Sequence, residues 1–237
     1  MAKHGKRYQL AISEFNQDES YSPSDAIALV KKMAGTKFDE TVELHLRTNA
    51  DPRHAEQMVR GVTALPHGLG KPQRVLVLAQ GDAARQATEA GADYVGDDDL
   101  IARIEGGWVE FDVAVATPDM MSRIGKLGRV LGRRGLMPNP RTGTVVQPQD
   151  VGKTVIEAKG GRVEFRTDRT AIIHCAIGKA SFDEDKLVDN MATLMDAVNQ
   201  NRPAAIKGQF VQTAFLTSTM GPSVRLDVAS TMGMKVT

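Results

Sequence analysis

A run of arginines and glycines near the middle of the chain is the part of the sequence best suited to bind an anion. The stretch from Met120 to Gln149 contains no carboxylate, and its basic residues are Arg123, Lys126, Arg129, Arg133, Arg134 and Arg141. The glycines between them are Gly125, Gly128, Gly132 and Gly135. Arginine and lysine neutralise phosphate, and glycine lets a polyanion approach the backbone. This pattern predicts an anionic partner, and structured RNA is the partner we favour.

The excess of positive charge in this run is local, because the whole chain is nearly neutral. Lys and Arg together number 30 and Asp and Glu 29, which gives a net charge of +1. In such a chain a run of one sign says more about a partner than the total charge does. The chain has 237 residues and 41% hydrophobic content, which is ordinary globular composition, and we expect two domains.

Cysteine content and hydropathy indicate the compartment. The single cysteine, Cys175, lies in the apolar run 171–177, so we expect a packed thiol, no disulfide framework and a reducing compartment. No stretch approaches a membrane span, and the basic start, residues 2–7, lacks the apolar core of a secretory signal. We therefore expect a cytoplasmic protein with no membrane partner. The basic start is either a solvated terminus, which we prefer, or an arm that touches phosphates.

Both ends of the chain combine helices with half-buried strands. Residues 24–32 carry apolar side chains at helical spacing after the Ser22-Pro23 start, which predicts a helix. Residues 41–47 alternate apolar and polar side chains, as a strand with one buried face does. Later strands are expected at 162–166, 172–177, 210–217 and 223–228, and a helix at 183–199. We expect residues 167–170 to join the first two of these strands as a hairpin.

The middle of the chain has a different texture. Residues 68–72 form a break, and the apolar runs 74–79 and 111–116 lack alternation, as strands covered on both faces do. Helix-like segments at 82–90 and 98–104 lie between these runs. Strands that alternate with short helices indicate a small doubly wound module.

The simplest assembly inserts this module into a domain made of the two chain ends. The expected fold class is α/β with two domains. Residues 1–68 and 160–237 form a discontinuous α+β domain, and residues 69–159 form the inserted α/β domain. Two connections between the domains predict a hinge.

An enzyme that binds a nucleotide in the inserted domain is the main alternative. A phosphate-binding loop ending at Gly70-Lys71 requires glycine at position 65 and Ser or Thr at position 72, where the chain has leucine and proline. A dinucleotide fingerprint also fails, because residues 80–85 supply one glycine and a carboxylate. We therefore expect no cofactor and no catalytic residues. A protein-interaction adaptor is a third class.

Metal binding is not expected either. The histidines are scattered without the close spacing of a zinc site, and they are His4, His45, His54, His67 and His174. We interpret each as a surface or core imidazole. The acidic triplet 97–99 stands at the entrance of an expected helix, where it is interpreted as a helix cap rather than as a magnesium site.

The segment from Leu127 to Val145, LGRVLGRRGLMPNPRTGTV, resembles the signature of the L-one family of ribosomal proteins. Members of this family belong to the mobile stalk of the large subunit, beside the tRNA exit site. The resemblance covers the whole chain, including residues 37–43, 65–68 and 219–223. It implies a main RNA-binding domain built from the chain ends and a Rossmann-like, three-layer insertion.

The resemblance also implies partners and a cellular role. The expected partner is the large-subunit ribosomal RNA, and the protein assists release of deacylated tRNA from the exit site. In bacterial members the protein also binds messenger RNA of its own operon and represses its translation. The resemblance thus implies a noncatalytic, ribosome-associated cytoplasmic protein that is monomeric when free.

Carried onto this sequence, the family's RNA contacts match residues from both ends of the chain: Lys37, Phe38, Glu43, Thr217, Ser218, Thr219, Met220 and Gly221. Hydroxyls suit ribose, glycine allows close approach, and Phe38 and Met220 offer apolar surface. From the residues alone, burial in the core is the preferred interpretation of Phe38, and a plain turn that of 219–222. The resemblance reverses the preference for the turn.

The basic run is expected to be a secondary site, with Arg129, Arg133, Arg134 and Arg141 as its contacts. Three interpretations stay open: a solvated loop, a latch between the domains, and a phosphate contact. The resemblance places this run in the inserted domain, which contributes less to RNA affinity in the family than the terminal domain does.

Overall fold

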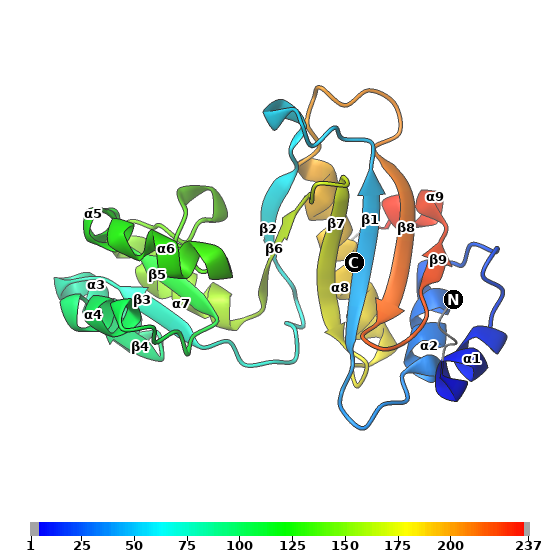
Figure 1. Ribbon diagram of the computed structural model, residues 1–237, viewed down its shortest axis with the longest axis horizontal. Helices are drawn as coiled ribbons and strands as arrows, with labels where there is room; N and C mark the ends of the chain where they lie inside the picture. Colours follow the sequence, from blue (N-terminus) through cyan, green and yellow to red (C-terminus); the bar gives the residue numbers. More distant parts are fainter. Residues whose placement is uncertain (1–4, 235–237) are drawn as a thin grey trace. The chain divides into compact units, whose positions relative to one another are not determined.

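The computed structural model describes residues 5–234 and divides the chain into two compact units (Figure 1). The terminal unit consists of Met1–Gly70 and Val163–Thr237, and the inserted unit is Lys71–Arg162. Helices and strands are mixed in both units, which confirms the expected α/β class. Part of the basic start, residues 2–4, lies outside the described residues. The RNA-binding role expected for residues 1–68 and 160–237 stays a prediction.

The terminal unit is built on a four-stranded antiparallel sheet with the order β7-β1-β8-β9. Its strands are β1 (Thr41–Thr48), β7 (Ile172–Lys179), β8 (Val211–Ser218) and β9 (Val224–Leu226). Burial alternates along β1, so Val42, Leu44 and Leu46 point into the core. This is the period-two pattern expected for a strand with one buried face.

Helices α2 (Pro23–Met33) and α8 (Glu184–Gln200) cover one face of this sheet, and Figure 1 shows α8 behind β7 and β1. α2 begins as expected, because the Ser22 hydroxyl accepts a hydrogen bond from the Asp25 N–H and Pro23 occupies the first turn. No helix of residues 5–234 packs on the opposite face, which we call the open face. Its residues include Glu43, His45 and Arg47 of β1, His174 of β7 and Phe215 and Thr217 of β8.

A separate two-stranded sheet joins β2 (Arg60–Ala64) to β6 (Arg162–Arg166). The hairpin expected between β6 and β7 forms only at its tip, where Thr167 and Ile173 make an isolated antiparallel bridge. Beyond the tip the prediction is wrong, because β6 pairs with β2 while β7 pairs with β1. The intervening chain turns tightly between the two sheets. Asp168 accepts hydrogen bonds from the N–H groups of Thr170 and Ile172, and Ala171 has a φ of 63°. Local sequence predicted β6, β7 and the turn, but neither β2 nor the strand partners.

The inserted unit is a three-layer module around a parallel sheet with the order β4-β3-β5. Its strands are β3 (Val75–Leu78), β4 (Tyr94–Gly96) and β5 (Val113–Ala116), and its longer helices are α3 (Gly81–Glu89), α4 (Asp98–Glu105) and α7 (Val151–Lys159). Val75 and Val77 pack with α3 and α7 on one face. Leu76 and Leu78 pack with α4 on the other. Every residue of β3 is buried, as the absence of alternation predicted.

The basic run is a succession of helical turns rather than the loop expected from its glycines. These turns are η2 (Pro118–Met120), α5 (Met121–Ile124), η3 (Gly125–Leu127), α6 (Gly128–Leu131) and η4 (Gly132–Arg134). Ile124, Leu127 and Leu131 recur at helical spacing and are fully buried. The packed apolar stripe holds the turns on the sheet and directs the arginines outward.

The remaining short elements are α1 (Lys6–Ser13), η1 (Ala55–Gln57), η5 (Pro140–Thr142), η6 (Pro148–Asp150) and α9 (Val228–Met232). No helix in residues 5–234 is both long enough and apolar enough to span a membrane.

Candidate nucleic-acid interface

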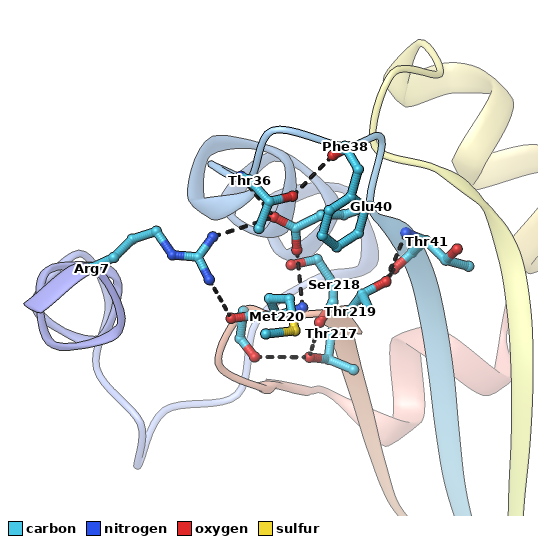
Figure 2. Close-up of polar contacts among 10 residues, drawn as sticks. Arg7, Thr36, Phe38, Glu40, Thr41, Thr217, Ser218, Thr219 and Met220 are labelled. Carbon is cyan, nitrogen blue, oxygen red and sulfur yellow. Dashed lines mark hydrogen bonds and ion pairs between the residues drawn. The ribbon is translucent and has the colours of Figure 1, made fainter. Parts of the chain in front are cut away.

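Two segments that are distant in the sequence lie side by side at one end of the four-stranded sheet. β1 and β8 are antiparallel with Val42 opposite Ser218, so the loop before β1 lies beside the turn after β8 (Figure 2). The loop carries Phe38 and the turn carries Met220, and these side chains are 54% and 53% exposed. The core position preferred for Phe38 from the residues alone is therefore wrong. Two large apolar side chains on one small surface form a candidate binding face, since such residues are usually covered.

A buried carboxylate holds the loop and the turn together. Glu40 is 1% exposed, and its Oε1 accepts a hydrogen bond of 3.1 Å from the Thr36 N–H. Its Oε2 accepts one of 3.0 Å from the Met220 N–H. One side chain thus bonds to the backbone just before Phe38 and to that of Met220. Sequence reasoning missed Glu40, since only the fold reveals which backbone groups it bonds to.

The surroundings of Glu40 favour its ionised form. Burial raises the pKa, but hydrogen bonding from the Ser218 side chain, the Met220 N–H and Thr36 outweighs burial, so the pKa is below its ordinary value of 4.5. The Ser218 hydroxyl lies beside the carboxylate without a hydrogen bond of standard geometry (Figure 2). Glu40 is therefore an anion at neutral pH.

Arg7 of α1 joins this arrangement from the start of the chain. Its Nη2 donates to the Met220 carbonyl over 3.3 Å, and its Nη1 lies 3.7 Å from the Glu40 carboxylate (Figure 2). The side chain remains 46% exposed. Arg7 therefore supports the turn and also presents positive charge at the edge of the candidate face.

Most hydroxyls expected to contact ribose instead shape the turn. Ser218 is only 2% exposed, so its side chain belongs to the interior of the turn, and its assignment as an RNA contact stays a prediction. The Thr219 hydroxyl accepts a hydrogen bond of 2.9 Å from the Thr41 N–H. The Thr217 hydroxyl donates to the Ser218 carbonyl over 3.0 Å and also lies near the carbonyls of Gly221 and Pro222. These bonds fix the backbone that carries Met220.

Gly221 leaves room in the turn for the Ser218 side chain. A Cβ at this position would lie 2.4 Å from the Ser218 Oγ, which is closer than real Cβ contacts. Gly221 was expected to allow close approach of a ligand, and in the structure it allows close approach of the Ser218 side chain. Lys37 is exposed in the loop, whereas Glu43 is 40% exposed on the open face, opposite Thr217 in the ladder.

The arginines of the basic run form a second, separate surface on the inserted unit. Arg129, Arg133 and Arg134 line a hollow of about 380 Å³. None of the three forms an ion pair with a residue of the described chain. Arg141 is exposed in η5, where its N–H donates to the Asn139 side chain. Unpaired arginines around a hollow suit phosphate oxygens.

A third basic cluster, which sequence reasoning missed, lies at the other end of β1. Its members are Arg47, Arg53, Arg166 and Arg169, and we call it the far-end cluster. They are exposed, line two hollows of about 450 Å³ each, and form no ion pair within residues 5–234. The cluster joins residues that are distant in sequence, so no local run of basic residues predicts it.

Comparison with known proteins identifies the family. The profile of the ribosomal protein L1p/L10e family matches residues 30–222. The chain belongs to the ribosomal protein L1p/L10e family. This confirms the resemblance seen in the sequence.

Relatives in this family match along the full chain. The large ribosomal subunit protein uL1 of Thermomicrobium roseum is 56% identical over 233 residues, 98% of this chain and 97% of the relative. The proteins of the same name from Chloroflexus aggregans and Dehalococcoides mccartyi are each 54% identical, over 100% and 99% of both chains respectively. Membership in a ribosomal protein family confirms that the chain is not an enzyme.

The thiol of Cys175 is buried in the core of the terminal unit. Burial raises the pKa of the Cys175 thiol to about 12, so the thiol is protonated and unreactive at neutral pH. Within residues 5–234, no group of three or more His, Cys, Asp or Glu side chains is arranged to hold a metal ion.

Proposed function

We propose that this protein is a structural constituent of the large ribosomal subunit and binds the ribosomal RNA of the mobile stalk through the terminal unit. The observation that carries the proposal is that Phe38 and Met220 are exposed while Glu40 accepts hydrogen bonds from the backbone beside them. We call this surface, with Lys37, Arg7 and the turn 219–221, the Phe38–Met220 face. The name of its relatives, a large ribosomal subunit protein, supports the same assignment and a ribosome-associated, cytoplasmic location.

The face suits folded RNA because it combines flat apolar surface with cations at its edge. Phe38 and Met220 can pack on unstacked bases or ribose, and stacking of a base contributes about 1–3 kcal/mol. Lys37 and Arg7 can contact the phosphates that flank such a base. The internal hydrogen bonds of the turn keep the backbone rigid, so little conformational entropy is lost on binding. The expected mode is recognition of RNA shape rather than of a base sequence.

Truncation of the apolar side chains tests this proposal. Phe38→Ala and Met220→Ala are each expected to weaken binding to a stalk fragment of large-subunit ribosomal RNA by about tenfold to a hundredfold. Ile156→Ala is the matched control, since Ile156 is 63% exposed but lies in the inserted unit. Isothermal titration calorimetry measures the affinity. Unchanged affinity in both variants, with unchanged melting temperature, would remove the face from the interaction.

We propose that the same face binds messenger RNA of the protein's own operon and thereby represses its translation. A face that recognises shape accepts any RNA that presents the same fold. Competition between the stalk fragment and the leader of the operon transcript is therefore expected. Phe38→Ala should weaken both complexes by similar factors, and a loss confined to the ribosomal fragment would show that the messenger RNA uses another surface.

The far-end cluster supports a role in release of deacylated tRNA from the exit site. A tRNA presents a folded backbone of phosphates, and unpaired, exposed arginines bind phosphates without base specificity. We propose that Arg53 and Arg169 contact exit-site tRNA while the opposite end of β1 holds the stalk. Arg53→Ala with Arg169→Ala is expected to weaken tRNA binding to ribosomes at the exit site, with unchanged affinity for the stalk fragment. Slowed release of tRNA from reconstituted ribosomes checks the functional consequence.

A further inference from the structure

Two histidines face one another on the open face of the four-stranded sheet. His45 of β1 and His174 of β7 are directly opposed in the ladder. Their Nδ1 atoms are 2.9 Å apart, and their ring centroids are 5.0 Å apart. The side chain of His174 is 51% exposed and that of His45 is 24% exposed, so solvent reaches the pair. No local pattern predicts this arrangement, because the two residues are far apart in the sequence.

Each ring has a carboxylate at its opposite nitrogen. The Nε2 of His45 lies 3.8 Å from the Glu43 carboxylate, and the Nε2 of His174 lies 3.6 Å from the Asp168 carboxylate. An anion near Nε2 favours the tautomer that carries the proton there. When both rings adopt it, two Nδ1 lone pairs face each other across 2.9 Å and repel. If one ring instead carries its proton on Nδ1, the two Nδ1 atoms form a hydrogen bond, but the bare Nε2 of that ring faces a carboxylate.

Neither neutral arrangement of the pair is therefore free of a repulsive contact. A cation bound by both Nδ1 atoms removes the repulsion and leaves the Nε2 proton of each ring on the side where a carboxylate lies. In metal sites the second ring N–H of a histidine ligand donates to a carboxylate, carbonyl or water, and here carboxylates lie 3.8 and 3.6 Å from these nitrogens.

We propose that His45 and His174 form a binding site for a divalent cation of the late transition series, such as Zn²⁺ or Ni²⁺. With metal–nitrogen bonds of about 2.0–2.1 Å, nitrogens at this separation subtend an angle of about 90° at the metal. That angle suits tetragonal or octahedral coordination, and a slight opening of the rings gives the tetrahedral angle. Water completes the coordination, because the protein supplies two ligands.

The chemistry of the donors selects the kind of cation. Imidazole nitrogen suits Zn²⁺, Ni²⁺ and Cu²⁺, whereas Mg²⁺ and Ca²⁺ prefer oxygen ligands. Metal binds the neutral form of imidazole. Bound metal would tie β1 to β7 on the face that no helix of the described chain covers.

The experiment measures Zn²⁺ binding to the full-length protein with His4 replaced by Asn, so that the histidine near the chain start does not contribute. Isothermal titration calorimetry is expected to show one bound Zn²⁺ per chain. His174→Gln should weaken this binding by at least about tenfold. His54→Gln is the matched control, because His54 also lies 3.8 Å from a carboxylate but faces no second ring within the described chain, and it should leave the affinity unchanged.

Nitrogen-15 spectra of the imidazoles distinguish this site from binding elsewhere. Zn²⁺ should shift the Nδ1 resonances of His45 and His174 and leave those of His54 and His67 in place. The melting temperature of the parent should rise with Zn²⁺ and that of His174→Gln should not. Equal Zn²⁺ affinity in parent and His174→Gln, or Nδ1 resonances of the pair that do not move, would overturn the proposal. Either result holds whether or not the protein binds RNA, so the proposed function is tested independently.

Discussion

Replacement of Glu40 by Gln tests whether one buried carboxylate builds the Phe38–Met220 face. The variant keeps the shape of the side chain but offers one acceptor oxygen instead of two. It therefore cannot accept from both the Thr36 and the Met220 N–H groups, which are now 3.1 and 3.0 Å from the carboxylate oxygens. One N–H remains unpaired or faces the new amide donor.

The size of the effect follows from these two bonds. A hydrogen bond to a charged group contributes about 1.5–3 kcal/mol, and an unpaired buried N–H costs about 1–3 kcal/mol. Because Glu40 lies just beneath the surface, the lower part of these ranges applies, and we expect a loss of about 1.5–2.5 kcal/mol in the free energy of unfolding. RNA affinity should fall by about tenfold, because Phe38 and Met220 lose their fixed backbone.

The effect of Glu40→Gln should also depend on pH. The folded state lowers the pKa of Glu40 below its ordinary value of 4.5, so the ionised carboxylate stabilises the fold above that value. Its contribution is lost as the pH falls through the lowered pKa. The difference in unfolding free energy between parent and variant should therefore be full at about pH 7 and shrink below about pH 4.

Urea denaturation at a series of pH values measures the stability difference, and calorimetry with the stalk fragment measures the affinity. Glu56→Gln is the control for loss of a carboxylate, since Glu56 is exposed and belongs to the same unit. A stability difference that stays constant as the pH falls would refute the role of the ionised carboxylate. Unchanged RNA affinity in a destabilised variant would refute its role in positioning the face.

Three further predictions concern other parts of the chain. Gly221→Ala should lower the free energy of unfolding by about 1–3 kcal/mol and weaken RNA binding, because the new Cβ overlaps the Ser218 Oγ. Gly125→Ala is the control, since a Cβ there meets nothing within 4 Å, and it should not destabilise the protein in the same thermal melts. Asn190→Leu should lower the free energy of unfolding by about 1–3 kcal/mol, since the buried amide bonds to the His67 N–H and to the carbonyls of Gly68 and Ile177. Hydrogen exchange of the backbone amides at residues 67 and 68 should accelerate, and unchanged protection would contradict the argument. Arg129→Ala with Arg134→Ala should reduce the salt slope of RNA binding by about 1 for each phosphate that the variant no longer neutralises, whereas an unchanged slope would place both arginines outside the complex.

The sequence predicted those elements whose pattern is local. The helix α2 carries its own signals in Ser22, Pro23 and its apolar spacing, and β3 is an unbroken apolar run. The pairing of β6 with β2 instead of β7 could not be predicted, because strand partners are chosen by contacts distant in sequence. The helical turns at 118–134 were missed since frequent glycines normally indicate a loop.

The candidate site shows the same division between local and distant information. Phe38 and Met220 were predicted as RNA contacts through a family resemblance, while the residues alone favoured a buried Phe38. Glu40 was missed and Arg7 was noted only as part of the basic start, because they contact Met220 across 180 and 213 positions of the chain. The roles of such residues depend on which backbone groups the fold brings near them. The residue type alone therefore does not predict these roles.

The hydrogen bonds inside the turn explain how a small face could serve two RNA ligands. Thr217, Thr219 and Glu40 direct their polar atoms inward, so the outward surface at the turn is left to Met220 and, across from it, Phe38. A surface of this kind has few directional bonds to lose when the base sequence changes. It discriminates by whether a base or ribose can lie flat against it while phosphates reach Lys37 and Arg7. A rigid Phe38–Met220 face can therefore bind a ribosomal stalk RNA and a messenger RNA that share a fold but differ in base sequence.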